Sequence, residues 1–264
     1  METVTSADGT VIAYDRVGDG PALIVVNGAF STRTALVAPA DLARQFTVVT
    51  YDRRGRGDSG EVGPAPAERE AAEREYEDLA AVAAATGART PFVFGHSSGA
   101  AIALRAVAAG LPVAGVVAYE APFGNDDTPL PDVDPDQRIR ELVGAGRNRE
   151  AVVFWMIDVV RAPDLTRAQL DGAPWVTALE PLARTLPYDL AVTAGGVPEA
   201  ELGKITAPVL ILGGSDSPAW FRRSVAEQAA ATPGAQLRML DGFGHNVPPE
   251  VLAPILIDFF KSKS

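Results

Sequence analysis

The pentapeptide Gly95-His96-Ser97-Ser98-Gly99 contains residue types that could carry out nucleophilic chemistry. It follows the apolar run 91–94 and precedes a helical pattern. A serine hydroxyl is a weak nucleophile, so it needs exposure, an adjacent base and nearby amide donors. A tight strand-to-helix turn would expose Ser97 and place the Ser98 amide at a helix N-terminus, where a developing oxyanion is favoured. The motif predicts a nucleophile at Ser97, although taken alone it also fits a glycine-rich turn that does no chemistry.

Two further side chains could complete a proton relay with Ser97. Asp216 follows the apolar run 209–212, and His245 follows the run 236–240. Because parallel strands place their carboxyl ends at one edge of a sheet, we expect these residues to meet Ser97 there. The chain has only two histidines, and His96 cannot easily turn back onto the adjacent hydroxyl. His245 is therefore the candidate base.

The acid that would orient His245 has two candidates. Glu120 ends the apolar run 113–119, so it too lies at this sheet edge. We favour Asp216, because the turn at 213–215 contains two glycines that free the backbone to aim a short side chain across the site. Glu120 precedes Ala121-Pro122, which we take to favour extended backbone and a place in the pocket wall.

The elements that must position these residues alternate between strands and helices. Strand-like apolar runs lie at 11–14, 22–26, 47–51, 91–94, 113–119, 209–212 and 236–240. Helical patterns cover 65–85, 99–109, 219–231 and 249–261. Continuous apolar runs are typical of parallel strands that helices cover on both faces. The sequence therefore predicts an α/β fold with a mostly parallel central sheet flanked by helices.

Residues 124–206 interrupt this alternation. No strand is evident there, and a loop rich in proline and aspartate leads into helical segments at 136–144, 149–161 and 173–185. We therefore expect a core domain formed by residues 1–123 and 207–264, with a helical insertion formed by residues 124–206.

The chain resembles serine hydrolases of the α/β-hydrolase fold. The resemblance rests on the motif around Ser97, on the chain order Ser97, Asp216, His245, and on residues 51–59, which are similar to the family's D-x-R-G-x-G-x-S stretch. In the family, the glycines and charged residues of that stretch more often stabilise the loop than take part in catalysis.

The resemblance also implies an oxyanion hole. In the family, the loop after the strand at 22–26 supplies one backbone amide, and the matching residue here is Ala29. The Ser98 amide would be the second donor. The loop departs from the family pattern at Asn27, where the family carries histidine.

Residues 124–206 stand where the family carries a helical cap over the active site. Large apolar residues of the cap would line a pocket for an apolar part of the substrate. Our candidate pocket residues are Phe30, Glu120, Trp155 and Trp175.

The implied activity is a cofactor-independent serine hydrolase that cleaves a carboxylic ester, lactone or thioester through an acyl-enzyme. Three other reactions could use the same triad: those of a cofactor-free perhydrolase of haloperoxidase type, a C–C hydrolase and a biosynthetic cyclase. A small-molecule receptor on the hydrolase scaffold is the alternative without catalysis. Epoxide hydrolases and haloalkane dehalogenases of this fold carry aspartate at the nucleophile position, so Ser97 argues against both.

Composition excludes several other classes of protein. Among 264 residues, 34 acidic and 23 basic side chains give a net charge of −11, which argues against binding to nucleic acid or to anionic membranes. The absence of cysteine excludes disulfides and thiolate metal sites, and two histidines nearly exclude a multi-histidine zinc site. No signal peptide or membrane-length apolar run is evident. We therefore expect a cytoplasmic protein with a small-molecule substrate, no cofactor and no metal.

Overall fold

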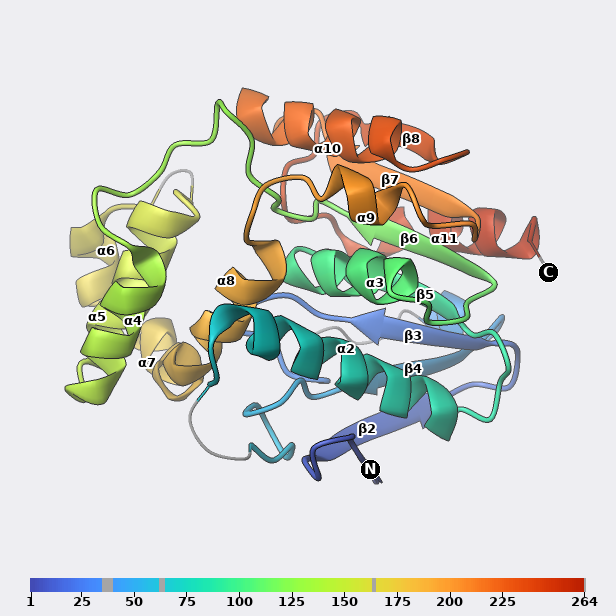
Figure 1. Cartoon of the computed structure of the whole chain (residues 1–264), viewed down its shortest axis with the longest axis horizontal. Coiled ribbons are helices and arrows are strands. Elements are labelled where there is room, and N and C mark those ends of the chain that lie inside the picture. The colour runs from blue at the N-terminus through green and yellow to red at the C-terminus, as the bar shows by residue number, and fades with distance from the viewer. Residues whose placement is uncertain (35–39, 62–64, 163–164, 264) are drawn as a thin grey trace.

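An eight-stranded sheet forms the centre of the molecule (Figure 1). The computed structural model describes residues 1–34, 40–61, 65–162 and 165–263. The strands are β1 (Glu2–Thr5), β2 (Val11–Val17), β3 (Ala22–Val26), β4 (Thr47–Tyr51), β5 (Phe92–His96), β6 (Gly115–Tyr119), β7 (Val209–Gly214) and β8 (Gln236–Leu240). Their order is β1-β2-β4-β3-β5-β6-β7-β8. Strands β3 to β8 pair with one another in parallel, whereas β2 pairs antiparallel with β1 and β4. The predicted mostly parallel sheet is therefore confirmed.

Helices cover both faces of this sheet, as predicted. They are α1 (Ala40–Ala43), α2 (Glu68–Ala85), α3 (Ser98–Ala108), α10 (Ala219–Ala231) and α11 (Pro249–Lys261). The strands alternate between two apolar clusters: Ile24 packs on the side of α2, α3 and α10, whereas Leu23 packs on the side of α1 and α11. Successive side chains of a strand point to opposite faces, so a strand that is buried on both sides must be apolar throughout.

All secondary structure in the described part of residues 124–206 is helical. It comprises α4 (Pro135–Gly144), α5 (Asn148–Phe154), η1 (Trp155–Val159), α6 (Arg167–Asp171), α7 (Pro174–Leu179), η2 (Glu180–Thr185), α8 (Leu186–Thr193) and α9 (Glu199–Leu202). Helices α4 to α7 gather beyond the carboxyl ends of the parallel strands (Figure 1). They share a third apolar cluster that includes Ile139, Val152 and Val176. Helix α8 packs against α2 and α3 of the core and also against α4 of the insertion, and its first residue, Leu186, belongs to the same cluster.

Two expected helices change type along their length. The segment at 149–161 is α-helical only to Phe154 and continues as the π-helical turn η1. There the Val160 amide donates to the Trp155 carbonyl at 2.9 Å, a bond that spans five residues. The segment at 173–185 becomes a 3₁₀ helix at its end, where Pro181 removes a backbone donor.

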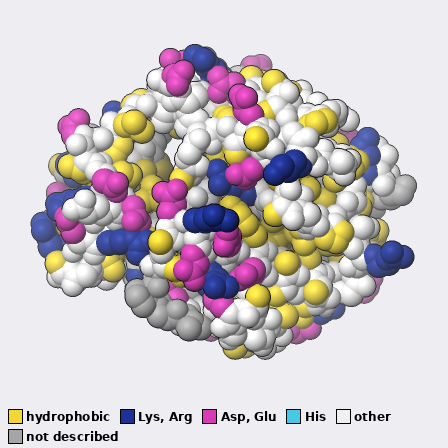
Figure 2. All heavy atoms as spheres, viewed as in Figure 1, with side chains coloured by type: hydrophobic (Ala, Val, Ile, Leu, Met, Phe, Trp, Pro, Cys, Tyr) yellow, Lys and Arg dark blue, Asp and Glu magenta, His cyan; other side chains and the backbone are white. Residues whose placement is uncertain are grey.

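The surface carries both positively and negatively charged side chains. On the face shown in Figure 2, acidic and basic side chains are interspersed. Among the described helices, none combines the length and the apolar character that a membrane crossing requires.

Candidate active site

Ser97 lies in a strained turn between β5 and α3. Its φ of 58° and ψ of −131° fall in a region that residues other than glycine rarely adopt. A Cβ atom on Gly95 would lie 2.5 Å from Ala100 Cα, and one on Gly99 would lie 2.1 Å from the Val26 carbonyl oxygen. Both positions therefore require glycine. The partly exposed Ser97 side chain has the setting that a nucleophilic serine needs.

The loop after β3 lies directly against this turn. A Cβ atom on Gly28 would approach Ser97 Cβ to 2.8 Å, so the backbone comes this close only because residue 28 is glycine. Among the hydrogen bonds of the described residues, none uses the amide of Ala29 or Ser98 as donor. Two unused N–H groups that flank a serine hydroxyl can bind a developing oxyanion.

His245 and Glu120 lie at the same sheet edge, after β8 and β6. His245 Nδ1 is 2.8 Å from Glu120 Oε2. The other carboxylate oxygen, Oε1, accepts from the Gly214 amide at 2.9 Å and from the Ser217 hydroxyl at 2.5 Å. Although burial alone would raise it, these three hydrogen bonds hold the pKa of Glu120 below its usual value. A buried, charged carboxylate therefore faces the imidazole.

The sequence-based choice of Asp216 as the partner of His245 is wrong. Asp216 is exposed, and its Oδ1 accepts from the Ser215 hydroxyl at 3.0 Å. Its contribution is made through the backbone, because its amide donates to the Phe243 carbonyl at 2.8 Å and so helps to hold the loop that carries His245.

The direction of the Glu120 side chain explains this error. A proline restricts only the residue directly before it, which is Ala121. Glu120 adopts a φ of 49°, a left-handed conformation that turns the chain out of β6. Its carboxylate therefore crosses the sheet edge to His245 instead of standing in a pocket wall.

Two aromatic side chains for which the sequence indicated no role in the site bind the backbone of the loop that carries His245. His96 Nε2 lies 2.9 Å from the His245 carbonyl oxygen, which can only accept, so this nitrogen carries the proton. Burial lowers the pKa of His96 to about 4, so the ring is neutral at pH 7. The Tyr119 hydroxyl donates to the Gly244 carbonyl. These residues are paired across β5 and β6, a register that the sequence alone did not reveal.

Within the described part of the chain, no hydrogen bond joins the Ser97 hydroxyl to the His245 ring. In enzymes without bound substrate, catalytic hydrogen bonds are often long and tighten only in the reactive complex. The geometry thus supplies a serine, an oriented imidazole and two amide donors at one sheet edge.

Two of the expected pocket residues lie together and one does not. The rings of Phe30 and Trp155 meet edge to face with centroids 6.4 Å apart. Trp155 is only 7% exposed, and both residues belong to the apolar cluster of the helical insertion. Trp175 is 48% exposed on α7, which argues against a place in an enclosed pocket.

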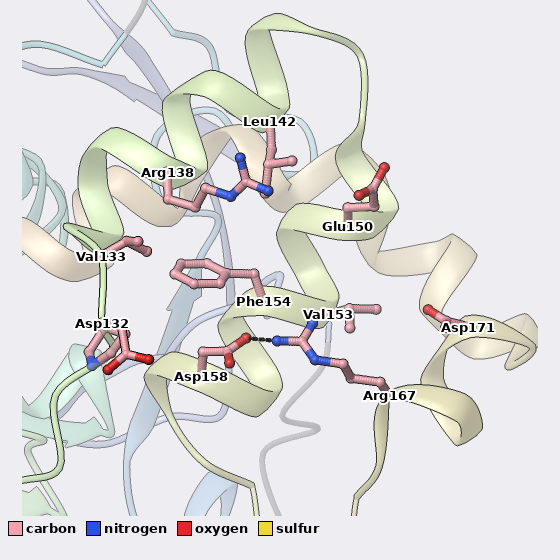
Figure 3. A pocket seen from close by; sticks show the side chains of 11 residues that line it. Asp132, Val133, Arg138, Leu142, Glu150, Val153, Phe154, Asp158, Arg167 and Asp171 are labelled. Atoms are coloured by element: carbon pink, nitrogen blue, oxygen red, sulfur yellow. Dashed lines mark hydrogen bonds and ion pairs between the residues drawn. The ribbon is translucent and has the colours of Figure 1, made fainter.

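A separate cavity of about 450 Å³ lies within the helical insertion (Figure 3). Phe154 stands at its centre, and the ion pair between Asp158 and Arg167 crosses one side. Its lining residues all fall between 131 and 171, so it is not part of the sheet-edge site. Nowhere in the described ranges do three or more potential metal ligands cluster.

Comparison with known proteins identifies similar chains. A family model described as the alpha/beta hydrolase family matches residues 23–253. An alpha/beta hydrolase from Sphaerobacter thermophilus DSM 20745 is 42% identical, with a TM-score of 0.89 and coverage of 98% of this chain and 100% of that one. An esterase from Rhodococcus sp. ECU1013 is 21% identical, with a TM-score of 0.73 and coverage of 100% and 99%. An enol-lactonase from Burkholderia xenovorans LB400 is 18% identical, with a TM-score of 0.74 and coverage of 98% and 100%. The last two likenesses are evidence for the fold alone.

Proposed function

The chain belongs to the alpha/beta hydrolase family, and from that premise we propose that it is a serine hydrolase acting on a carboxylic ester, lactone or thioester. The observation that carries the proposal is the contact of 2.8 Å between His245 Nδ1 and the buried Glu120 carboxylate, at the sheet edge that also presents Ser97. A carboxylate that accepts from Nδ1 leaves Nε2 unprotonated, which is the form of imidazole that a general base requires.

Each group then has one role in acyl transfer. Ser97 Oγ attacks the carbonyl carbon while His245 Nε2 takes its proton, and the imidazolium returns that proton to the leaving group. Glu120, in place of Asp216, fixes the tautomer and stabilises the imidazolium. The amides of Ala29 and Ser98 bind the oxyanion. Water, activated by His245, then releases the acyl group from Ser97.

The apolar contact beside this site supports a substrate with an apolar portion. Phe30 follows the proposed oxyanion residue Ala29 and packs on Trp155, and this contact supports an aromatic surface beside the reacting carbonyl. Apolar walls with a few polar groups are typical of small-molecule sites.

Turnover and active-site labelling test the proposal together. Wild-type protein should hydrolyse members of a p-nitrophenyl ester and lactone panel and should react with a fluorophosphonate probe. Ser97→Ala should fold normally, lose the label and retain only the residual acceleration of about 10³–10⁴ over water that binding and the oxyanion hole provide. The matched control is Ser262→Ala, which removes a hydroxyl that donates to the Phe259 carbonyl at the end of α11. Near-wild-type turnover by Ser97→Ala would falsify the nucleophile assignment, and a wild type that neither labels nor turns over would favour a receptor.

A further inference from the structure

A group of buried charges lies behind the proposed oxyanion hole, and a residue of the helical insertion stands at its centre. Asp189 on α8 is fully buried. Its Oδ1 accepts from Arg53 Nη1 at 2.7 Å and from the Ser98 hydroxyl at 2.6 Å. Its Oδ2 accepts from Arg56 Nη2 at 2.7 Å. One carboxylate thus connects the insertion to the helix that follows Ser97 and to the loop after β4.

Arg56 uses its other terminal nitrogen on the oxyanion loop itself. Arg56 Nη1 donates to the Gly28 carbonyl at 2.7 Å. The Gly28 carbonyl and the Ala29 amide belong to the same planar peptide unit. Because that unit is trans, as are all peptide bonds of the described chain, the C=O and N–H point in opposite directions. Fixing the carbonyl therefore fixes the direction of the Ala29 N–H.

The hydrogen bond also changes the strength of that donor. A charged guanidinium on the Gly28 carbonyl forms a charge-assisted bond, and hydrogen bonds in series polarise one another at low local dielectric. The Ala29 N–H should therefore be a stronger donor to a negative oxygen than an isolated amide.

The burial of Arg56 is not explained by stability alone. Its Nε is buried and has no acceptor within the described residues. A buried N–H without a partner is destabilising, and a buried ion pair gives little net stability even when it is well formed. The planar fork of arginine does, however, reach Gly28 and Asp189 with two separate nitrogens, which a lysine ammonium could not match in direction.

We propose that Arg56 is a positioning residue that orients the Gly28–Ala29 peptide for oxyanion binding, and that Asp189 of the helical insertion holds Arg56 in place. This role rests on the proposed function, because it concerns the oxyanion of the same acyl transfer. It assigns a task to the loop at 51–59 that its sequence pattern did not show.

The test compares Arg56→Gln with Arg54→Gln. Arg54 is the matched control: it comes from the same loop and is equally buried, but it pairs with Asp78 and Asp8, and its hydrogen bonds in the described chain do not reach the oxyanion loop. The measurements are kcat and KM for a p-nitrophenyl ester, and the inhibition constant of a trifluoromethyl ketone, which forms a serine-bound oxyanion. Loss of one oxyanion donor typically lowers kcat by about 10²–10³.

Arg56→Gln should lower kcat by about 10–100-fold, a share of that range because the amide is misdirected and not removed. KM should change by less than about threefold, and inhibition by the ketone should weaken by the same factor as kcat. Arg54→Gln should lower the melting temperature but leave both quantities near wild type. Asp189→Asn should also lower kcat, by a smaller factor than Arg56→Gln. If Arg56→Gln does not fold, kcat and ketone inhibition of Asp189→Asn test the proposal in its place.

Two results would overturn the proposal. One is a loss of stability in Arg56→Gln with unchanged kcat and ketone affinity, which would make Arg56 a purely structural residue. The other is an equal loss of kcat in the Arg54 and Arg56 variants, which would indicate general damage to the loop. A wild-type protein that neither hydrolyses esters nor binds the ketone would refute the proposed function, and this role with it.

Discussion

The exchange Glu120→Gln tests the assignment of the acid, because the two oxygens of Glu120 have different partners. Oε1 accepts from the Gly214 amide and the Ser217 hydroxyl, so a glutamine would keep its oxygen on that side. Its NH₂ group would then face His245 Nδ1, which lies 2.8 Å from Oε2 in the wild type. An NH₂ donor requires Nδ1 to accept, which puts the ring proton on Nε2. Nε2 could then no longer take the proton of Ser97.

The size of the effect follows from this change of tautomer. The corresponding exchange in the serine-protease template lowers kcat by about 10⁴, which is about 5.4 kcal/mol of barrier at 1.36 kcal/mol per tenfold. We expect Glu120→Gln to lose about 10⁴ in kcat on a p-nitrophenyl ester, with KM little changed. Asp216→Asn should stay within about threefold, because its carboxylate is exposed and, among the described residues, accepts a hydrogen bond from Ser215 alone.

The assay needs both kinetics and a fold control. Circular dichroism melts of the two variants show whether each is folded, and the rate of fluorophosphonate labelling reports activation of Ser97 without a leaving-group step. Labelling should slow in Glu120→Gln in parallel with kcat. The reasoning is refuted if folded Glu120→Gln keeps more than about a tenth of wild-type kcat, or if Asp216→Asn is the more damaged variant.

Two further predictions concern His96 and Trp155. The pKa of His96 is lowered to about 4 in the folded protein, so between pH 4 and 6.5 the unfolded chain binds the extra proton and stability rises with pH. Urea denaturation should show wild type losing about 2 kcal/mol more than His96→Asn between pH 7 and pH 5, at 1.36 kcal/mol per pKa unit; equal losses would contradict a neutral His96 imidazole in the folded protein. Trp155→Ala should lower the free energy of unfolding by about 3–5 kcal/mol, because the ring is buried against Phe30. A thermal melt that does not move, combined with a changed preference for acyl-chain length, would instead make Trp155 a wall of the substrate pocket.

Regular elements with a clear apolar pattern could be predicted from the sequence. Helices α10 and α11 begin and end at the predicted residues, because each follows a proline, and α11 also buries an apolar stripe. Helix α8 was not predicted. Nearly all of its residues are buried between the insertion and the core, so it lacks the polar face that produces a helical period.

The site could be predicted only where the backbone alone decides it. The motif around Ser97 places the turn, and the scarcity of histidine selects His245. The choice between Glu120 and Asp216 depends on a side-chain direction that the left-handed φ of Glu120 sets, and no local pattern reports that angle. The contact of Asp189 with Arg56 of the loop after β4 was equally hidden, because the two residues lie 133 positions apart.

The position of Asp189 has a consequence for the order of folding and for the grafting of modules. A chain that ends before α8 already contains Ser97 and the loop after β4. Among the described residues, Arg53 would then keep Glu75 as an ion-pair partner, but Arg56 would lose its partner Asp189. Leaving a buried cation without its partner costs about 3–5 kcal/mol, so the sheet edge should mature only after α8 has docked. A cap transplanted from a relative in place of residues 124–206 must therefore supply a carboxylate at the position of Asp189. Without it, the core would hold a buried arginine that has no counter-charge.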